Sequence, residues 1–292
     1  MHVFLILGST AAVFLPNRSS VKLAKVEGGT GYKTFMRRKD SLPPDNLGCR
    51  LLGTCPRKLD TDAATDMIAT LKSSAEAFLG TRFCFADVVL PDRGKTYQKE
   101  VVEAALVAHD LRLSFPIQSA AKVAIIANDP DDSALPDEQI VLAIDYSRSG
   151  LNLDLFCDDI GIVDSLGRQH HELGIGADNP DPAHWAAVSA ALQTMAQPPF
   201  PRCPMGYQDQ DRIHYLVLYG ERATDGNFLR TLVDVFGSDL VSRTRARDPE
   251  FVSALSAAEI SFDRQNNIDF RGEPSFGCRW RSGLHKELPG DL

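Results

Sequence analysis

The sequence of 292 residues has no long uninterrupted apolar run and no excess of positive charge. Its most apolar stretch, residues 2–15 (HVFLILGSTAAVFL), is broken at Gly8, Ser9 and Thr10, whereas a membrane-spanning helix needs about 20 apolar residues in succession. The start of the chain lacks the Lys or Arg of a secretory signal. The formal net charge of −8 argues against a general binder of nucleic acid or anionic membranes. We therefore expect a cytoplasmic protein with no nucleic-acid and no membrane partner.

The sequence also lacks closely spaced cysteine pairs. Its cysteines are scattered through the chain, at positions 49, 55, 84, 157, 203 and 278. This spacing predicts free thiols in a reducing compartment. The one concentration of other metal-ligand types, His170, His171 and Glu172 in RQHHELG, lacks a second ligand pair at diagnostic spacing. On a strand His170 and Glu172 would share a face, and we expect a surface hairpin there and no metal site.

What is present is the composition of an ordinary globular chain, with 43% hydrophobic and 24% charged residues. Residues 2–15 predict two buried strands joined by a tight turn, and residues 20–38 predict two further strand-like pieces around a glycine-rich turn. Later segments with the pattern of strands are residues 85–91, 113–118, 140–147, 150–158, 160–170 and 214–220. Segments with the pattern of helices are residues 62–80, 94–111, 119–128, 180–197, 225–237 and 248–261.

An Asp- and Pro-rich stretch, residues 128–139, is the clearest linker. Strands followed by helix, strand and helix occur on both sides of it, which predicts two α/β lobes with mixed central sheets. We place lobe I at residues 1–130 and lobe II at residues 138–263, and we expect residues 264–292 to form an irregular tail. Ligands of such folds bind beyond the ends of the strands.

The order of these segments resembles a known family. Residues 64–127 (ATDMIATLKSSAEAFLG to AAKVAIIA) resemble the helix, strand, helix and connecting helix in the nucleotide-binding domain of the seventy-kilodalton heat-shock chaperones. Residues 141–178 resemble the second phosphate strand and hairpin of that domain, and residues 216–237 its adenosine motif. The likeness covers roughly residues 3–262 in order, which is more specific than a single motif. It implies a bilobed actin-like ATPase fold with reduced outer subdomains and no peptide-binding domain.

The resemblance also implies which residues stand at the nucleotide. The residues matched to the three binding segments are Gly8, Ser9 and Thr10 in the first phosphate loop, Ser147, Ser149 and Gly150 in the second, and Gly220, Glu221 and Arg222 in the adenosine motif. Asp145 keeps the family's Asp, and Arg148 lies in the second loop. Arg148 either binds an anion or pairs with Asp145, and the pairing is favoured. These two are the candidate catalytic residues.

Under the same match, most of the groups that catalyse ATP hydrolysis in the family are absent from this sequence. Ile6, Cys49 and Ser119 stand where the family keeps an Asp, a Lys and a Glu around the phosphates. The resemblance therefore implies a catalytically impaired ATPase that requires no cofactor and binds ATP or ADP weakly at most. We expect its cleft to be vestigial or reused, and a reused cleft would suit a neutral or weakly anionic small molecule.

Two classes of function stay open. One is a regulator or scaffold, with a protein partner, built on a degenerate chaperone-type domain. The other is an ATP-independent enzyme, of isomerase or cyclase type in a biosynthetic pathway, that uses the cleft for small-molecule chemistry. An active ATPase is disfavoured because several charged groups are lost at once. The sequence does not separate the first two classes.

Overall fold

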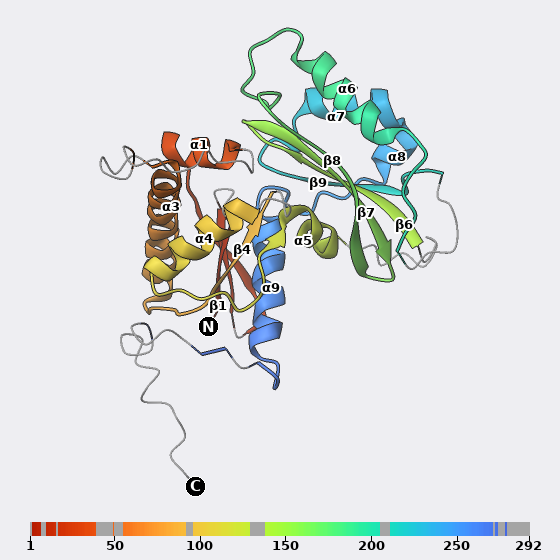
Figure 1. Ribbon diagram of the computed structural model, residues 1–292. Helices are drawn as coiled ribbons and strands as arrows, with labels where there is room; N and C mark the ends of the chain where they lie inside the picture. The colour runs from red at the N-terminus through yellow and green to blue at the C-terminus, as the bar shows by residue number, and fades with distance from the viewer. Residues whose placement is uncertain are drawn as a thin grey trace. The chain divides into compact units, whose positions relative to one another are not determined.

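The structure is a computed structural model. It describes residues 2–6, 10–15, 17–38, 49, 55–91, 96–128, 138–204, 211–270, 272–273 and 278. The fold is mixed α/β, as expected, with helices and strands interspersed along the chain (Figure 1). Two compact units are present: unit 1 comprises Met1–Ser119 with Ala257–Leu292, and unit 2 comprises Ala120–Ser256. Unit 2 is therefore an insertion within unit 1.

The compact units divide the chain at other residues than the two expected lobes do. Helix α5 (Ala120–Ala127), expected in the first lobe, belongs to unit 2 and packs against its strands. Helix α9 (Val252–Gln265) is shared, since it begins in unit 2 and ends in unit 1. Most of the expected linker, residues 129–137, lies outside the described residues.

Unit 1 contains a five-stranded sheet in the order β3-β2-β1-β4-β5. Its strands are β1 (His2–Ile6), β2 (Thr10–Phe14), β3 (Ser20–Lys25), β4 (Ala86–Leu90) and β5 (Gln118–Ser119). The first three are antiparallel, and β4 and β5 run parallel to β1. Every residue of β2 and β4 is buried, as expected for central strands whose two faces are both covered. The pairing of β1 with β2 confirms the two strands predicted at residues 2–15.

The helices of unit 1 are α1 (Thr30–Arg37), α3 (Pro56–Leu79) and α4 (Thr96–Ala108). Helix α3 begins with Pro56, whose missing N–H costs nothing at a helix start, and ends at Gly80 in the left-handed conformation. The strand predicted within residues 30–38 is wrong. Tyr32 and Phe35, three residues apart, are both buried because they share one face of helix α1.

A buried carboxyl group fastens α9 to unit 1. Asp87 in β4 accepts hydrogen bonds from the backbone N–H groups of Ser114 and Phe115, at 2.7 and 2.8 Å, and from the Ser114 hydroxyl. The Ser114 hydroxyl lies 2.7 Å from that of Ser261 on α9. One turn and the end of the shared helix are thus joined through Asp87.

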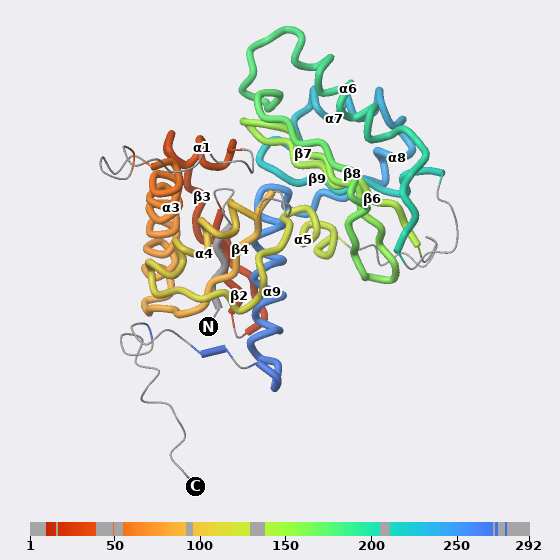
Figure 2. Tube along the Cα trace, viewed as in Figure 1, coloured from red at the N-terminus to blue at the C-terminus, as the bar shows by residue number. Residues whose placement is uncertain are grey.

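Unit 2 contains a four-stranded sheet in the order β8-β7-β6-β9. Its strands are β6 (Glu138–Tyr146), β7 (Gly150–Asp159), β8 (Ile162–Leu173) and β9 (Tyr215–Tyr219). Strands β6, β7 and β8 form the expected antiparallel triplet, which Figure 2 shows as consecutive lengths of chain, and β9 lies parallel to β6. The order third, second, first, fourth strand is the order of the first four strands of unit 1 as well.

Helices cover one face of this second sheet. They are α6 (His184–Ala196), α7 (Gly226–Phe236) and α8 (Ser238–Ser242), and Figure 1 shows α6 and α7 beside the strands. Ile144 and Leu153 point into the apolar core that also holds Leu192 and Phe228. The helices predicted at residues 180–197, 225–237 and 248–261 are confirmed. Among the described residues, no helix has both the length and the apolar character of a membrane span.

All six cysteines are joined in disulfides, so the prediction of free thiols is wrong. The pairs are Cys49–Cys55, Cys84–Cys278 and Cys157–Cys203. The paired cysteines are separated by 6, 194 and 46 residues in the sequence. These separations follow no regular pattern, so the pairing could not be predicted from the sequence and depends on the fold. The free-thiol argument for a reducing compartment therefore no longer applies.

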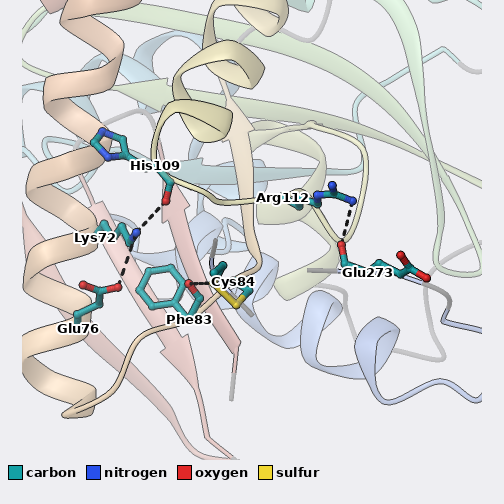
Figure 3. Close-up of a disulfide and its surroundings, with 8 residues drawn as sticks. Lys72, Glu76, Phe83, Cys84, His109, Arg112 and Glu273 are labelled. Atoms are coloured by element: carbon teal, nitrogen blue, oxygen red, sulfur yellow. Dashed lines mark hydrogen bonds and ion pairs between the residues drawn. A yellow bond between two sulfur atoms is a disulfide. The ribbon is translucent and has the colours of Figure 1, made fainter. Parts of the chain in front are cut away.

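The Cys84–Cys278 disulfide attaches the segment predicted as an irregular tail. Figure 3 shows Cys84 with its surroundings, including Arg112, whose Nη1 donates to the Glu273 carbonyl oxygen at 3.0 Å. The ring of Phe270 meets that of Phe85 edge-on, with centroids 5.6 Å apart. Three contacts therefore hold this part of the C-terminal segment against the N-terminal part of unit 1.

Candidate functional site

Four polar side chains form one row across the sheet of unit 2. Tyr219 on β9 lies opposite Asp145 on β6, Asp145 lies opposite Asn152 on β7, and Asn152 lies opposite His171 on β8. Residues directly opposite on neighbouring strands point to the same face of a sheet. Tyr219, Asp145, Asn152 and His171 are hereafter the polar row. Asp154, two residues after Asn152, faces the same side.

Hydrogen bonds fix the middle of the polar row. Asn152 Nδ2 donates to Asp145 Oδ2 at 2.9 Å, and His171 Nε2 lies 2.9 Å from Asp154 Oδ1. Tyr219 is only 4% exposed, and among the described residues its buried hydroxyl has no hydrogen-bond partner. Asp145 and Asn152 are half-buried, so solvent reaches the row.

The row holds a carboxyl group that is partly shielded from water. Burial raises the pKa of Asp145 to about 7, and the nearby Asp154 and Glu221 act in the same direction, whereas the Asn152 hydrogen bond and His171 oppose it. Burial, with the charges of Asp145 and Asp154, also holds the pKa of Tyr219 well above its usual value. Asp145 is therefore poised to exchange a proton near neutral pH, while Tyr219 stays protonated.

Beside the polar row, the β6–β7 turn binds an acidic side chain of the same unit. The Arg148 backbone N–H donates to Glu221 Oε1 at 3.2 Å, and Arg148 Nε lies 3.5 Å from the same oxygen. The predicted pairing of Arg148 with Asp145 is therefore wrong. Strand β9 ends beside β6, so the loop that follows it brings Glu221 alongside the turn, while Asp145 is held by Asn152.

A second loop closes over the same turn. The N–H groups of Gly174, Ala177 and Asp178 donate to the carbonyl oxygens of Ser149, Ser147 and Arg148, at 2.9 to 3.1 Å. Gly176 is required by this packing, because a Cβ there would come within 2.3 Å of the Arg148 carbonyl oxygen. The turn is thus a fixed part of unit 2.

The structure brings together only some of the predicted site residues. Those that lie together in unit 2 are Asp145, Ser147, Arg148, Ser149, Gly150, Gly220, Glu221 and Arg222. In this group the Arg222 N–H donates to the Tyr146 carbonyl oxygen at 3.0 Å. Gly8 and Ser9 lie outside the described residues, and Thr10 is buried at the start of β2 in unit 1.

The residues matched to lost catalytic groups also lie in unit 1. Ile6 ends β1, Ser119 is buried at the end of β5, and Cys49 is bound to Cys55 at the start of α3. His170 and Glu172 do share a face of β8, with His170 Nε2 3.1 Å from Glu172 Oε2. Within the described part of the chain, no group of three or more His, Cys, Asp or Glu residues could hold a metal ion.

Sequence reasoning missed Asn152, Asp154 and Tyr219 as members of the site. The alternation in GLNLDLF, residues 150–156, was the available signal, since Asn152 and Asp154 fall on one face between buried leucines. Tyr219 gave no such signal, because β9 is buried throughout.

Comparison with models of known protein families gives no match, and comparison with curated protein sequences gives none either. Function is therefore inferred from the residues and their geometry. The site offers three features. The half-buried carboxyl of Asp145 has a pKa of about 7, and the buried hydroxyl of Tyr219 has no hydrogen-bond partner among the described residues. The N–H and the guanidinium of Arg148 are directed at Glu221. Such groups can hydrogen-bond a ligand or move a proton.

Proposed function

We propose that the chain is a divergent protein of actin-like ATPase fold, related to the nucleotide-binding domains of the seventy-kilodalton heat-shock chaperones, that does not hydrolyse ATP. The repeated strand order supports the fold. Each unit has an antiparallel triplet with its third, second and first strands side by side, followed by a parallel strand. Two units with one topology fit a bilobed protein.

The contact between Arg148 and Glu221 is the main observation in support of the proposed loss of ATP hydrolysis. Phosphate sites use backbone N–H groups and cations that are available to an anion. In the turn that resembles the second phosphate loop, both the N–H and the guanidinium of Arg148 are directed at the carboxylate of Glu221. A phosphate group would have to displace that carboxylate and would then meet the negative charge of Asp145.

The cysteine at the lysine position supports the same conclusion. Cys49 would stand where the family keeps a catalytic cation, but it is held in a disulfide with Cys55 and carries no charge. Ser119 likewise offers a buried hydroxyl in place of a carboxylate. The groups that remain suit a binding role, as a regulator or scaffold, better than phosphoryl transfer.

Phosphate release from Mg-ATP and calorimetric titration with ADP and inorganic phosphate test this proposal on the full chain. We expect no release above the blank and no binding by the wild type. Glu221→Ala should gain weak phosphate binding through Arg148, and Arg148→Ala in the same chain should abolish the gain. Asp178→Ala, which removes an exposed acid of the neighbouring loop, is the matched control and should gain nothing. Turnover by the wild type that Asp145→Asn abolishes would contradict the proposal.

One observation favours the second candidate, an ATP-independent enzyme of isomerase or cyclase type. The carboxyl of Asp145, with a pKa of about 7, lies beside the phenol of Tyr219, and such a pair can transfer protons to and from a carbonyl compound. Incubation of a panel of ketones and aldehydes in heavy water, followed by proton NMR, tests it. Deuterium uptake that disappears in Asp145→Asn would favour the enzyme, and its absence across the panel favours the binding role.

A further inference from the structure

We propose that the polar row of unit 2 binds a small organic ammonium ion, with the Asp145 carboxylate as its charged partner and the Tyr219 hydroxyl as a second contact. The proposal goes beyond the loss of ATP hydrolysis and does not depend on it. Every residue that it uses belongs to unit 2, and each lies on one face of one sheet.

The first observation is an acceptor that the protein leaves available. Asp145 Oδ2 accepts the Asn152 amide, and this bond fixes the orientation of the carboxyl group. Among the described residues, no side chain or backbone group donates to Asp145 Oδ1. The half-buried position of Asp145 and Asn152 lets a small solute reach that oxygen.

The second, independent observation is the hydroxyl of Tyr219. It is buried, it has no hydrogen-bond partner among the described residues, and it neighbours Asp145 in the polar row. Buried hydroxyls in folded proteins are nearly always hydrogen-bonded, since leaving one unpaired costs stability. An unpaired hydroxyl beside an available carboxylate oxygen is explained if a ligand supplies the missing partner.

The charged groups around the polar row favour a cation as the ligand over an anion. The ionisable groups that act on Asp145 are two acids, Asp154 and Glu221, and one imidazole, His171. The basic groups here already have acidic partners, since His171 contacts Asp154 and Arg148 contacts Glu221. The sequence favoured a neutral or weakly anionic ligand because the family's acids and lysine are absent from the cleft, and it also favoured a pairing of Arg148 with Asp145. The observed pairing leaves Asp145 without a cation and reverses the expected sign of the ligand.

The chemistry of the acceptors favours an ammonium over a metal ion. A protonated amine carries up to three N–H donors, which match a carboxylate oxygen, an amide oxygen and a phenol oxygen. These are Asp145 Oδ1, Asn152 Oδ1 and Tyr219 Oη. Within the described residues no group of metal-ligating side chains is large enough to hold a metal. An amine with a nearby hydroxyl could use Tyr219 as a donor as well.

Proton release should accompany binding. The ionisable groups that face Asp145 are Asp154, His171, Glu221 and Tyr219. Because burial and the two acids raise the pKa of Asp145 to about 7, part of the population is protonated at neutral pH and cannot pair with a cation. Affinity should therefore rise as the pH increases from 6 to 8, roughly tenfold if Asp145 is the sole proton released.

Calorimetric titration of the full chain with ethylammonium and with ethanolamine, at pH 8 and constant ionic strength, is the test. We expect saturable binding of both and none of tetramethylammonium, which has no N–H donor. Asp145→Asn should weaken binding at least tenfold. Tyr219→Phe should weaken it several-fold while leaving the thermal midpoint of the free protein unchanged or raising it, because the unpaired hydroxyl is gone.

Glu172→Gln is the matched control, since Glu172 is an exposed acid on the opposite face of the same sheet, and it should leave binding unchanged. Absence of saturable binding would overturn the proposal, and so would equal binding of tetramethylammonium. Equal affinity in the Tyr219→Phe variant would remove the role of the hydroxyl and overturn the site as proposed. The ATP hydrolysis experiment is unaffected by any of these outcomes.

Discussion

Gly220 lies directly against the carboxyl group of Asp145. Its φ is +98°, and a Cβ built on it would come within 2.2 Å of Asp145 Oδ1 and 2.7 Å of the Tyr146 carbonyl oxygen. The Gly220 N–H donates to the Pro249 carbonyl oxygen at 2.8 Å, which holds the loop after β9 close to β6. The absence of a side chain at this position therefore lets that loop pass Asp145 and bring Glu221 to the β6–β7 turn.

Gly220→Ala should destabilise the protein by about 2–4 kcal/mol, because it combines an unfavourable positive φ with a steric clash against backbone. Chemical denaturation gives the free energy of unfolding. Gly226→Ala is the control, since a Cβ at that residue, the first of α7, meets nothing within 4 Å. The control should lie within about 0.5 kcal/mol of the wild type. Equal losses in the two variants would mean that Gly220 does not lie against Asp145.

Asp145→Asn should stabilise the protein increasingly as the pH rises. The folded protein holds the Asp145 proton with a pKa of about 7, whereas an unfolded chain releases it near 3.9. Ionisation therefore opposes folding, so the Asp145 contribution to stability is greatest below about pH 4, falls as the pH rises to 7, and is constant above. Because Asp145 is partly exposed, we expect a gain of about 1–3 kcal/mol at pH 8 and almost none at pH 4.

Unfolding curves of both proteins at several pH values measure this difference. Glu172→Gln serves as control, because Glu172 is exposed and faces the opposite side of the sheet. Its effect should be small at every pH. A gain from Asp145→Asn that stays constant between pH 4 and pH 8 would show that Asp145 ionises in the folded protein as it does in an unfolded chain.

Periodicity predicted most of the fold and little of the site. The strands β6, β7 and β9 are apolar runs bounded by turn residues, and α6, α7 and α9 carry a helical pattern, so local sequence determined them. Helix α1 was missed because the segment was interpreted as a strand that follows a glycine-rich turn, although Tyr32 and Phe35 are spaced by three residues, which suits one face of a helix. The spacing of the apolar residues was the better guide to this segment.

The site depended on contacts that no local pattern contains. From the sequence, Arg148 was expected to bind an anion or to pair with Asp145. Its contact with Glu221 depends on the path of the loop after β9, which no local pattern contains. The polar row requires the register of four strands, including β9, which begins at Tyr215, whereas β7 ends at Asp159. The disulfides likewise join residues that the sequence separates by as many as 194 positions.

Asp87→Asn should cost about 2–3 kcal/mol of stability. The carboxyl oxygens accept two backbone N–H groups and a hydroxyl, and the amide of an asparagine would direct its own donors at one side of that set. Ser261→Ala is the graded control, because it removes one hydroxyl from the edge of the same cluster and should cost about 1 kcal/mol. A loss from Asp87→Asn no larger than that from Ser261→Ala would contradict the anchoring role of Asp87.

The disulfides make a prediction that concerns the whole chain. Protein purified without reductant should have a mass lower, by six hydrogens, than the same protein after reduction, since no cysteine is free. Peptide mapping without reduction should recover the pairs Cys49–Cys55, Cys84–Cys278 and Cys157–Cys203. Alkylation of intact unreduced protein at several cysteines would contradict this pairing.

The three disulfides should differ in their effect on stability in the order of the loops that they close. Cys84–Cys278 spans 194 residues, so its ring contains all of unit 2, whereas Cys157–Cys203 spans 46 residues within that unit. In the chain-entropy model, loss of the longer ring costs about 1 kcal/mol more than loss of the shorter, out of typical totals of about 2–4 kcal/mol. Double variants, Cys84→Ser with Cys278→Ser and Cys157→Ser with Cys203→Ser, leave no odd thiol behind. Denaturation of each under identical conditions should rank the 84–278 variant as the less stable, and the opposite rank would mean that Cys278 contributes little to holding the C-terminal segment on unit 1.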